Sequence, residues 1–221
     1  MRGILGWLPV VLCAGFVRLS TAATAVTVEV DATAASRGIE RTHLVMPVKS
    51  GPLTLLFPKW LPGEHSPDGP IAGLSGLTFT ANGRPLAWHR DLDNIFAFHL
   101  RIPAGVQLLD VSFEVVSVPN ASDGNALRTS TDSLAIVLWN QLVLYSAGIQ
   151  SDDIQYTARL LPPTGWSAAT ALPRAEGTAC GLQFRTVSLT TLIDSPAIIG
   201  RFVRALELGG TLPVYLHLAG R

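Results

Sequence analysis

Apolar and polar residues alternate along much of the chain. The clearest runs lie at residues 26–31, 96–102, 110–115, 154–160 and 214–218. In the first run, three valines interleave with Thr27, Glu29 and Asp31. A period of two residues places one face of a strand in a core and the other in water, as in antiparallel sheets. The pattern therefore predicts a protein built from half-buried β-strands.

Turn residues separate these runs. Asn82-Gly83 stands between two alternating segments and predicts a tight β-hairpin. The apolar segment 133–145 is compatible with a buried helix, but its Val, Ile, Trp and Tyr content favours two core strands that turn near Asn140-Gln141. No repeat or low-complexity linker interrupts the chain. We therefore predict an all-β protein, with one antiparallel β-sandwich-like domain over residues 26–221.

The first 25 residues have the composition of a secretory signal peptide. Arg2 precedes an apolar run of 14 residues, Ile4 to Val17, and small residues follow up to Ala25. The run is shorter than the roughly 20 residues that span a bilayer. We expect cleavage near Ala25, export to the periplasm or the medium, and no membrane span afterwards. Cys13 would leave with the signal, so Cys180 could form no intramolecular disulfide.

The charge of the chain argues against one class of partner. Charged residues make up 14% of the sequence and the formal net charge is zero. Nucleic-acid-binding proteins carry a basic patch or stripe, and none stands out here. We expect no nucleic-acid partner.

Residues that could carry chemistry are few. The chain lacks the H-E-x-x-H motif of zinc peptidases and the G-x-S-x-G motif of serine hydrolases. His89 and His99 lie on adjacent expected strands and can come near one another, but a solvated or hydrogen-bonded role explains each better than a metal-ligand role. Asp91 and Asp93 lie at an expected turn, where Asp favours local hydrogen bonds. We expect no catalytic residue and no metal ligand.

The segment "FPKWLPGEHSPDGP" (57–70) is the most distinctive loop. It follows an expected strand, and its four prolines and two glycines indicate a stiff connection with tight bends. Trp60, Glu64 and His65 are candidates for a surface that faces a partner or a substrate. A metal site is disfavoured because only one imidazole is available.

The same loop carries a family resemblance. Residues 57–106, together with "WNQLVLYSAG" (139–148), "GWSAATALP" (165–173) and "VSLTTLIDSPAIIGRFVRALEL" (187–208), resemble the N-terminal domain of the glycyl-aminopeptidase-type zinc metallopeptidases, metallopeptidase family sixty-one. The resemblance implies a β-rich domain that precedes a thermolysin-like catalytic domain. The zinc ligands and the general base of that family belong to the catalytic domain, so it implies no cofactor in this chain.

Two functions are compatible with these observations. The first is a non-catalytic N-terminal β-domain of an exported zinc aminopeptidase-type protein, which supports a catalytic domain that the chain lacks and forms one wall of its substrate cleft. Its partners would be that catalytic domain or a peptide. The alternative is a stand-alone exported β-sandwich module that binds a peptide or a glycan.

Overall fold

A computed structural model describes residues 25–60, 66–67, 69–117, 130–175, 181–212 and 214–220. Residues 1–24 of the predicted signal peptide, Cys180 and the pair Glu64-His65 lie outside these residues. Helical structure within them is limited to three 3-10 turns, η1 (Ala35–Arg37), η2 (Ile71–Gly73) and η3 (Trp139–Gln141), and the short helix α1 (Leu189–Ile193). The described part is otherwise built from β-strands, which confirms the all-β prediction.

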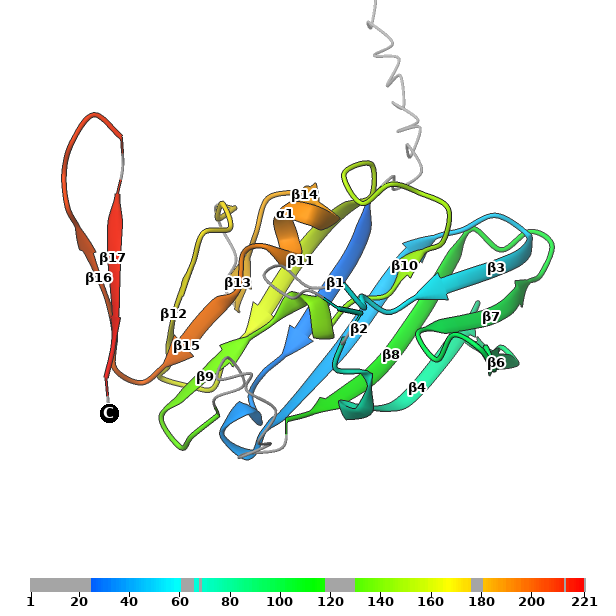
Figure 1. The fold of residues 1–221 in the computed structure, drawn as a ribbon, viewed down its shortest axis with the longest axis horizontal. Helices are drawn as coiled ribbons and strands as arrows, with labels where there is room; N and C mark the ends of the chain where they lie inside the picture. Colours follow the sequence, from blue (N-terminus) through cyan, green and yellow to red (C-terminus); the bar gives the residue numbers. More distant parts are fainter. Residues whose placement is uncertain are drawn as a thin grey trace, which may run out of the picture.

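The largest sheet has eight strands (Figure 1). Seven of them follow the order β13 (Leu182–Gln183), β11 (Gln155–Leu161), β1 (Val26–Asp31), β2 (Ile39–Pro47), β8 (Leu108–Val116), β4 (Leu74–Ala81) and β5 (Arg84–Pro85). The eighth, β14 (Val187–Ser188), pairs with β11. The pairs are antiparallel except for β1 and β11, which run parallel. The antiparallel prediction is therefore right for this sheet with one exception.

Two smaller sheets form the second layer. One has the order β10 (Tyr145–Ser146), β3 (Gly51–Leu56), β7 (Ala97–Ile102) and β6 (Trp88–Arg90). The other has the order β12 (Ser167–Thr170), β15 (Ala197–Gly200) and β9 (Leu134–Val137). Their inward side chains join one hydrophobic core with those of the large sheet. Because alternation leaves one face of the large sheet for that core, both small sheets cover the same face, which gives a sandwich-like arrangement.

Inward and outward residues alternate as the sequence predicts. On β1, Val26, Val28 and Val30 are buried, whereas the residues between them are exposed or half-buried. The outward face of the large sheet carries ion pairs, Arg41 with Glu114 at 2.7 Å among them. Both partners are partly exposed, so such a pair contributes at most about 1 kcal/mol to stability. This face is solvated surface.

The predicted turn at Asn82-Gly83 is present between β4 and β5. Asn82 has φ 50° and Gly83 has φ 73°, the left-handed conformations that a two-residue hairpin of this type requires. The turn predicted near Asn140-Gln141 is also present, as η3. The strands on either side of η3 belong to different sheets, so they do not form a hairpin.

The last two strands differ from the prediction. β16 (Val203–Glu207) and β17 (Tyr215–Ala219) form a hairpin that extends from the body of the molecule (Figure 1). Alternation over 214–218 predicts a half-buried strand, but every residue of β17 is exposed. The sequence prediction of burial is wrong for β17, although β16 of the same hairpin lies near β12 and β15.

One buried hydrogen bond links the two layers. The Tyr156 hydroxyl on β11 donates to the Leu144 carbonyl oxygen at 2.8 Å, and both residues are fully buried. We predict that Tyr156→Phe lowers the free energy of unfolding by about 1–2 kcal/mol, because the Leu144 carbonyl is left without a partner inside the core. Urea denaturation measures this change. Tyr215→Phe on the exposed hairpin is the matched control, and an equal loss in both variants would contradict the assignment.

Candidate functional site

The loop after β3 is anchored at its base. The Phe57 amide donates to the Phe96 carbonyl oxygen at 2.8 Å, and the Gly69 amide donates to the Lys59 carbonyl oxygen at 3.0 Å. A Cβ atom at Gly69 would lie 2.2 Å from the Pro58 carbonyl oxygen, so only glycine fits this approach. The two ends of the loop are therefore held together.

Trp60 lies at the start of this loop and is 58% exposed. Glu64 and His65, the other two candidates from the sequence, lie outside the described residues. The structure thus places the Trp60 side chain at the surface and leaves the role of the three residues a prediction.

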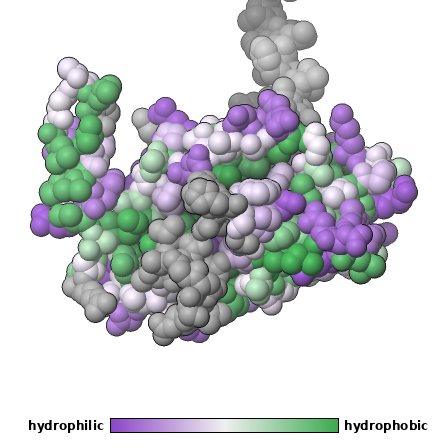
Figure 2. All heavy atoms as spheres, viewed as in Figure 1, coloured by the Kyte–Doolittle hydropathy of each residue, from purple (hydrophilic) through white to green (hydrophobic). Residues whose placement is uncertain are grey.

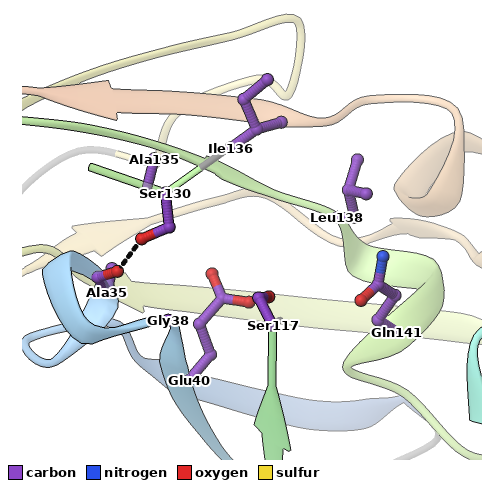
Figure 3. Close-up of a pocket in the computed structure, with 9 residues that line it drawn as sticks. All are labelled: Ala35, Gly38, Glu40, Ser117, Ser130, Ala135, Ile136, Leu138 and Gln141. Carbon is purple, nitrogen blue, oxygen red and sulfur yellow. Dashed lines mark hydrogen bonds between the residues drawn. The ribbon is translucent and has the colours of Figure 1, made fainter. Parts of the chain in front are cut away.

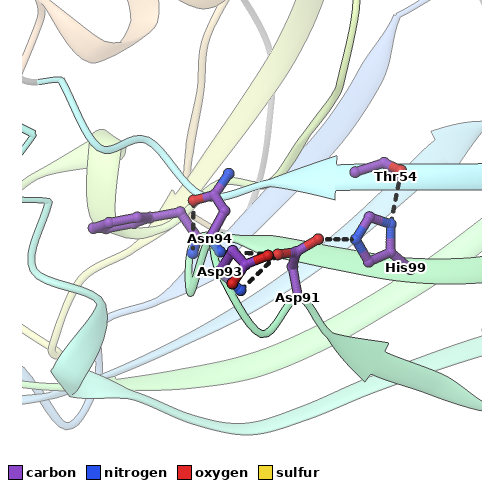
Figure 4. A network of polar contacts seen from close by, with 6 residues as sticks. Thr54, Asp91, Asp93, Asn94 and His99 are labelled. Atoms are coloured by element: carbon purple, nitrogen blue, oxygen red, sulfur yellow. Dashed lines mark hydrogen bonds and ion pairs between the residues drawn. The ribbon is translucent and has the colours of Figure 1, made fainter.

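A polar network lies on the outward face of the smaller sheet with β3, β7 and β6 (Figure 4). His99 Nε2 lies 2.8 Å from Asp91 Oδ2, and His99 Nδ1 lies 2.9 Å from Thr54 Oγ1. Asp91 Oδ1 also accepts hydrogen bonds from the backbone amides of Asp93 and Asn94. The turn interpretation of Asp91 is confirmed, as is the hydrogen-bonded interpretation of His99.

These contacts lower the pKa of Asp91 to about 2. The main cause is the hydrogen bond from His99, followed by those from the Asn94 and Asp93 amides. Asp91 is therefore ionised at neutral pH and accepts at both oxygens. Because an ionised carboxylate only accepts, His99 Nε2 donates the hydrogen bond to Asp91.

His89 lies directly opposite His99, on the neighbouring strand β6. The two ring centroids are 5.1 Å apart, which confirms that these histidines come together. A surface groove of about 390 Å³ runs beside them, and its lining includes Thr54 and Arg101. Within the described ranges, no three His, Cys, Asp or Glu side chains converge as metal ligands.

A second polar feature is buried between the layers (Figure 3). Glu40 on β2 is only 6% exposed, and its side chain points into a small cavity with room for about one water molecule. Its Oε1 atom has no hydrogen-bond partner in the described part of the chain. All the described residues that line the cavity are uncharged apart from Glu40 itself: Ala35, Gly38, Ser117, Ser130, Ala135, Ile136, Leu138 and Gln141. Burial raises the pKa of the Glu40 carboxyl to about 7.

The β16–β17 hairpin has one apolar face, which we call the hairpin face. Leu206 pairs with Leu216 and Arg204 pairs with Leu218, so these four side chains point to the same side. The ladder continues outward, since the Leu208 amide donates to the Val214 carbonyl oxygen at 2.9 Å. The exposed aliphatic residues of the hairpin face are 40–60% accessible: Leu206, Leu208, Val214, Leu216 and Leu218. Figure 2 shows hydrophobic residues gathered on this hairpin.

The opposite side of the hairpin is more polar. It carries Glu207, Tyr215 and His217, and the last two rings stack with centroids 6.4 Å apart. Alternation predicted core positions for the apolar residues of 214–218, because it does not reveal what covers a strand. An amphipathic hairpin with its apolar face in water is typical of an interaction surface.

Comparison with known proteins decides the family. The Peptidase M61 N-terminal domain family matches residues 27–201. The chain belongs to this family. The family resemblance noted from the loop and the later segments is therefore confirmed. None of the curated proteins compared with the chain matches it.

Solved structures of zinc metallopeptidases share the fold. An aminopeptidase N family protein from Idiomarina loihiensis is 20% identical, with a TM-score of 0.73 over 89% of this chain and 32% of that one. An M1 zinc metallopeptidase from Deinococcus radiodurans, solved with a Tyr-Ser-Ala substrate, is 13% identical, with a TM-score of 0.52 over 88% of this chain and 46% of that one. Yeast LTA4 hydrolase in complex with bestatin is 9% identical, with a TM-score of 0.51 over 86% of this chain and 30% of that one.

The β16–β17 hairpin lies just beyond the region that the family match covers. The M61 N-terminal domain ends its match at residue 201, and β16 begins at Val203. The chain spans less than half the length of the three structures above. No helix in the described ranges is long and apolar enough to cross a membrane.

The buried Glu40 gives a pH-dependent prediction. Its pKa rises from 4.5 in the unfolded chain to about 7 in the folded one, so the folded state binds the proton more tightly. The associated stability is fully present below pH 4.5 and is lost as the pH rises through 7. We predict that the free energy of unfolding falls by about 3 kcal/mol between pH 4.5 and pH 8 through this group.

Glu40→Gln tests this assignment. Its neutral amide has no proton to lose, so the variant should lack most of that decrease and exceed the parent in stability at pH 8. Urea denaturation at a series of pH values measures both proteins. Parallel stability curves for the two proteins would show that Glu40 is not the titrating group.

Proposed function

We propose that the chain is a non-catalytic β-domain that supports the catalytic domain of an exported zinc aminopeptidase-type protein. The exposed hairpin face, placed directly after the family-matched region, is the observation that carries this proposal. Zinc would be held by the catalytic domain alone. The domain would contribute packing and position, with no catalytic residue of its own.

The energetics of the hairpin favour a covering partner. An isolated two-stranded hairpin is marginally stable in water, and full burial of one Leu side chain contributes about 1.5–3 kcal/mol. Leu206 and Leu216 lie opposite one another at the centre of the hairpin face and are 40% and 44% exposed. A partner that covered the remaining exposed area of both would gain about 1–2 kcal/mol from them. A globular catalytic domain can offer a complementary apolar surface of that size.

The Trp60 loop suits a second role within this function. An exposed aromatic residue beside a loop base fixed by Gly69 is well placed to contact a partner or a peptide substrate. We include Trp60, Glu64 and His65 as a wall of the substrate cleft.

The signal-like composition of residues 1–25 supports export, and N-terminal sequencing of the protein purified from its host tests it. A new N-terminus near Val26 supports export, and retention of Met1 contradicts it.

The hairpin face gives a direct test. We predict that the double change Leu206→Ser and Leu216→Ser shifts the free energy of unfolding of the chain alone by less than about 1 kcal/mol, because both residues are exposed. In a longer protein that carries the M61 catalytic domain, the same change should destabilise the domain pair by about 2 kcal/mol more than the chain alone, since burial of the exposed part of two Leu side chains is lost. Denaturant titration of both forms measures the difference.

The matched control for this test lies on the opposite side of the same strands. Ala205→Ser with His217→Ser should have the same small effect in both forms. If the leucine variants change the chain alone and the longer protein equally, the hairpin face does not contact the catalytic domain. A stand-alone peptide-binding or glycan-binding module would give that result.

Trp60 is tested by kinetics. In the longer protein, we predict that Trp60→Ala lowers kcat/KM for peptide substrates by about tenfold, since loss of one buried aromatic contact at an interface is worth about 1–2 kcal/mol. The stability of the chain alone should change little, because the side chain is exposed. Unchanged kinetics together with unchanged stability would remove the loop from the proposed function.

A further inference from the structure

The hydrogen bonds of the β16–β17 hairpin follow a regular pattern. In an antiparallel ladder, hydrogen-bonded residue pairs alternate with pairs that are not hydrogen-bonded. The Leu208 amide donates to the Val214 carbonyl oxygen at 2.9 Å, and the register continues without a shift along both strands. Counting in steps of two from this pair shows which residues of β17 bond to β16. They are Leu216 and Leu218.

The other residues of β17 direct their amides and carbonyl oxygens away from β16. These residues are Tyr215, His217 and Ala219. Within the described ranges β17 pairs with β16 alone, and every residue of β17 is exposed. The free edge of β17 therefore presents a row of backbone donors and acceptors. Another extended strand has donors and acceptors at the matching spacing.

This free edge lacks the features that normally prevent strand addition. Proteins protect sheet edges with charged side chains, with proline, with bulges or with very short strands. The edge strand β5 of the large sheet is two residues long and carries Arg84 and Pro85. In contrast, β17 has five residues in regular register, with no proline, no bulge and no Lys, Arg, Asp or Glu side chain. It is therefore open to strand addition.

The opposite edge of the hairpin is less suitable. β16 lies near β12 and β15 of the molecular body. It also carries Arg204 and Glu207, and charged side chains disfavour an added strand. Strand addition is therefore favoured at β17.

We propose that β17 accepts a strand from the catalytic domain, so that the hairpin becomes part of a sheet that both domains share. This inference rests on the proposed function. It adds backbone pairing at the edge of β17 to the apolar contact at the hairpin face.

The base of the hairpin is a favourable place for such a strand to begin. The Gly220 amide donates to the Phe202 carbonyl oxygen at 3.1 Å, so β17 ends beside the start of β16 (Figure 1). A polypeptide that continues from β17 starts next to the free edge, and consecutive strands are usually neighbours in a sheet. The chain covers 32% of the aminopeptidase N family protein from Idiomarina loihiensis, so a protein of that size has further segments that can supply the strand.

The side chains of β17 specify the chemistry of the added strand. On one side the strand would lie beside Leu216 and Leu218, where apolar residues would extend the hairpin face. On the other side it would lie beside Tyr215 and His217, whose rings stack with centroids 6.4 Å apart. Aromatic and β-branched residues form favourable cross-strand pairs with aromatic rings. We therefore expect a strand in which apolar residues alternate with aromatic or β-branched ones.

Hydrogen–deuterium exchange at single-residue resolution tests the proposal. In a longer protein that carries the M61 catalytic domain, the Tyr215 and His217 amides should exchange about 100-fold or more slowly than in the chain alone, because the added strand accepts from them. Their protection should match that of the Leu216 and Leu218 amides, which bond to β16. Mass spectrometry with electron-transfer fragmentation resolves these neighbouring amides.

A pair of variants at His217 separates the backbone from the side chain. His217→Pro removes an amide that faces the free edge, a position where an edge strand tolerates proline. It should lower the urea midpoint of the longer protein and change that of the chain alone little. His217→Ala is the matched control, because it loses the same imidazole and keeps the amide, and it should leave both midpoints nearly unchanged. Equal effects of the two variants in the longer protein would contradict backbone pairing.

The exchange pattern distinguishes failure of this proposal from failure of the proposed function. Slow exchange at Leu216 and Leu218 with fast exchange at Tyr215 and His217 would overturn strand addition and leave the contact at the hairpin face intact. Fast exchange at all four amides would reject both. Protection that increases with protein concentration, together with a doubled mass in light scattering, would assign the edge to a second copy of the protein and would also overturn the proposal.

Discussion

The burial of one face of the β1–β2–β8 sheet constrains the rest of the molecule. Val28, Leu44 and Val111 on these strands are fully buried, and the two smaller sheets cover them. Side chains alternate strictly along a strand, so the inward direction of Leu44 also turns Thr42 and Glu40 inward. The buried carboxyl of Glu40 is thus a consequence of the register that buries the core.

The same alternation places polar side chains of the second layer on its outer face. Leu55 and Phe98 are fully buried beneath the sheet, so their neighbours Thr54 and His99 face outward. The cross-strand register then aligns Thr54, His99 and His89 in one row. The row of Thr54, His99 and His89 beside the groove follows from strand geometry, whereas the bond from His99 to Asp91 also needs the turn after β6.

Local patterns in the sequence predicted the parts of the structure that depend on near neighbours. The alternation at 26–31 and the Asn82-Gly83 turn were sufficient for β1 and for the β4–β5 hairpin, because side-chain direction and turn type are local properties. The parallel pairing of β1 with β11 joins segments about 130 residues apart, and no local pattern encodes it. Exposure of the β16–β17 hairpin was missed for a similar reason, since alternation marks an apolar face and not the surface that covers it.

The candidate site was predicted in part. The proximity of His89 and His99 followed from their places on neighbouring strands, but the bond from His99 to Asp91 depends on how the turn after β6 folds back. The Trp60 loop was recognised from its composition, whereas the hairpin face requires the three-dimensional register of Leu206 with Leu216. Family membership now rests on a match over residues 27–201.

Hydrogen–deuterium exchange over residues 203–219 tests the central claim most directly. It compares the chain alone with a longer protein that carries the M61 catalytic domain, and β1 and β2 serve as an internal reference in both. We predict fast exchange of the hairpin amides in the chain alone and strong protection in the longer protein, with equal protection of the reference strands. Equal exchange of the hairpin in both proteins would contradict a domain that supports its catalytic partner through this surface.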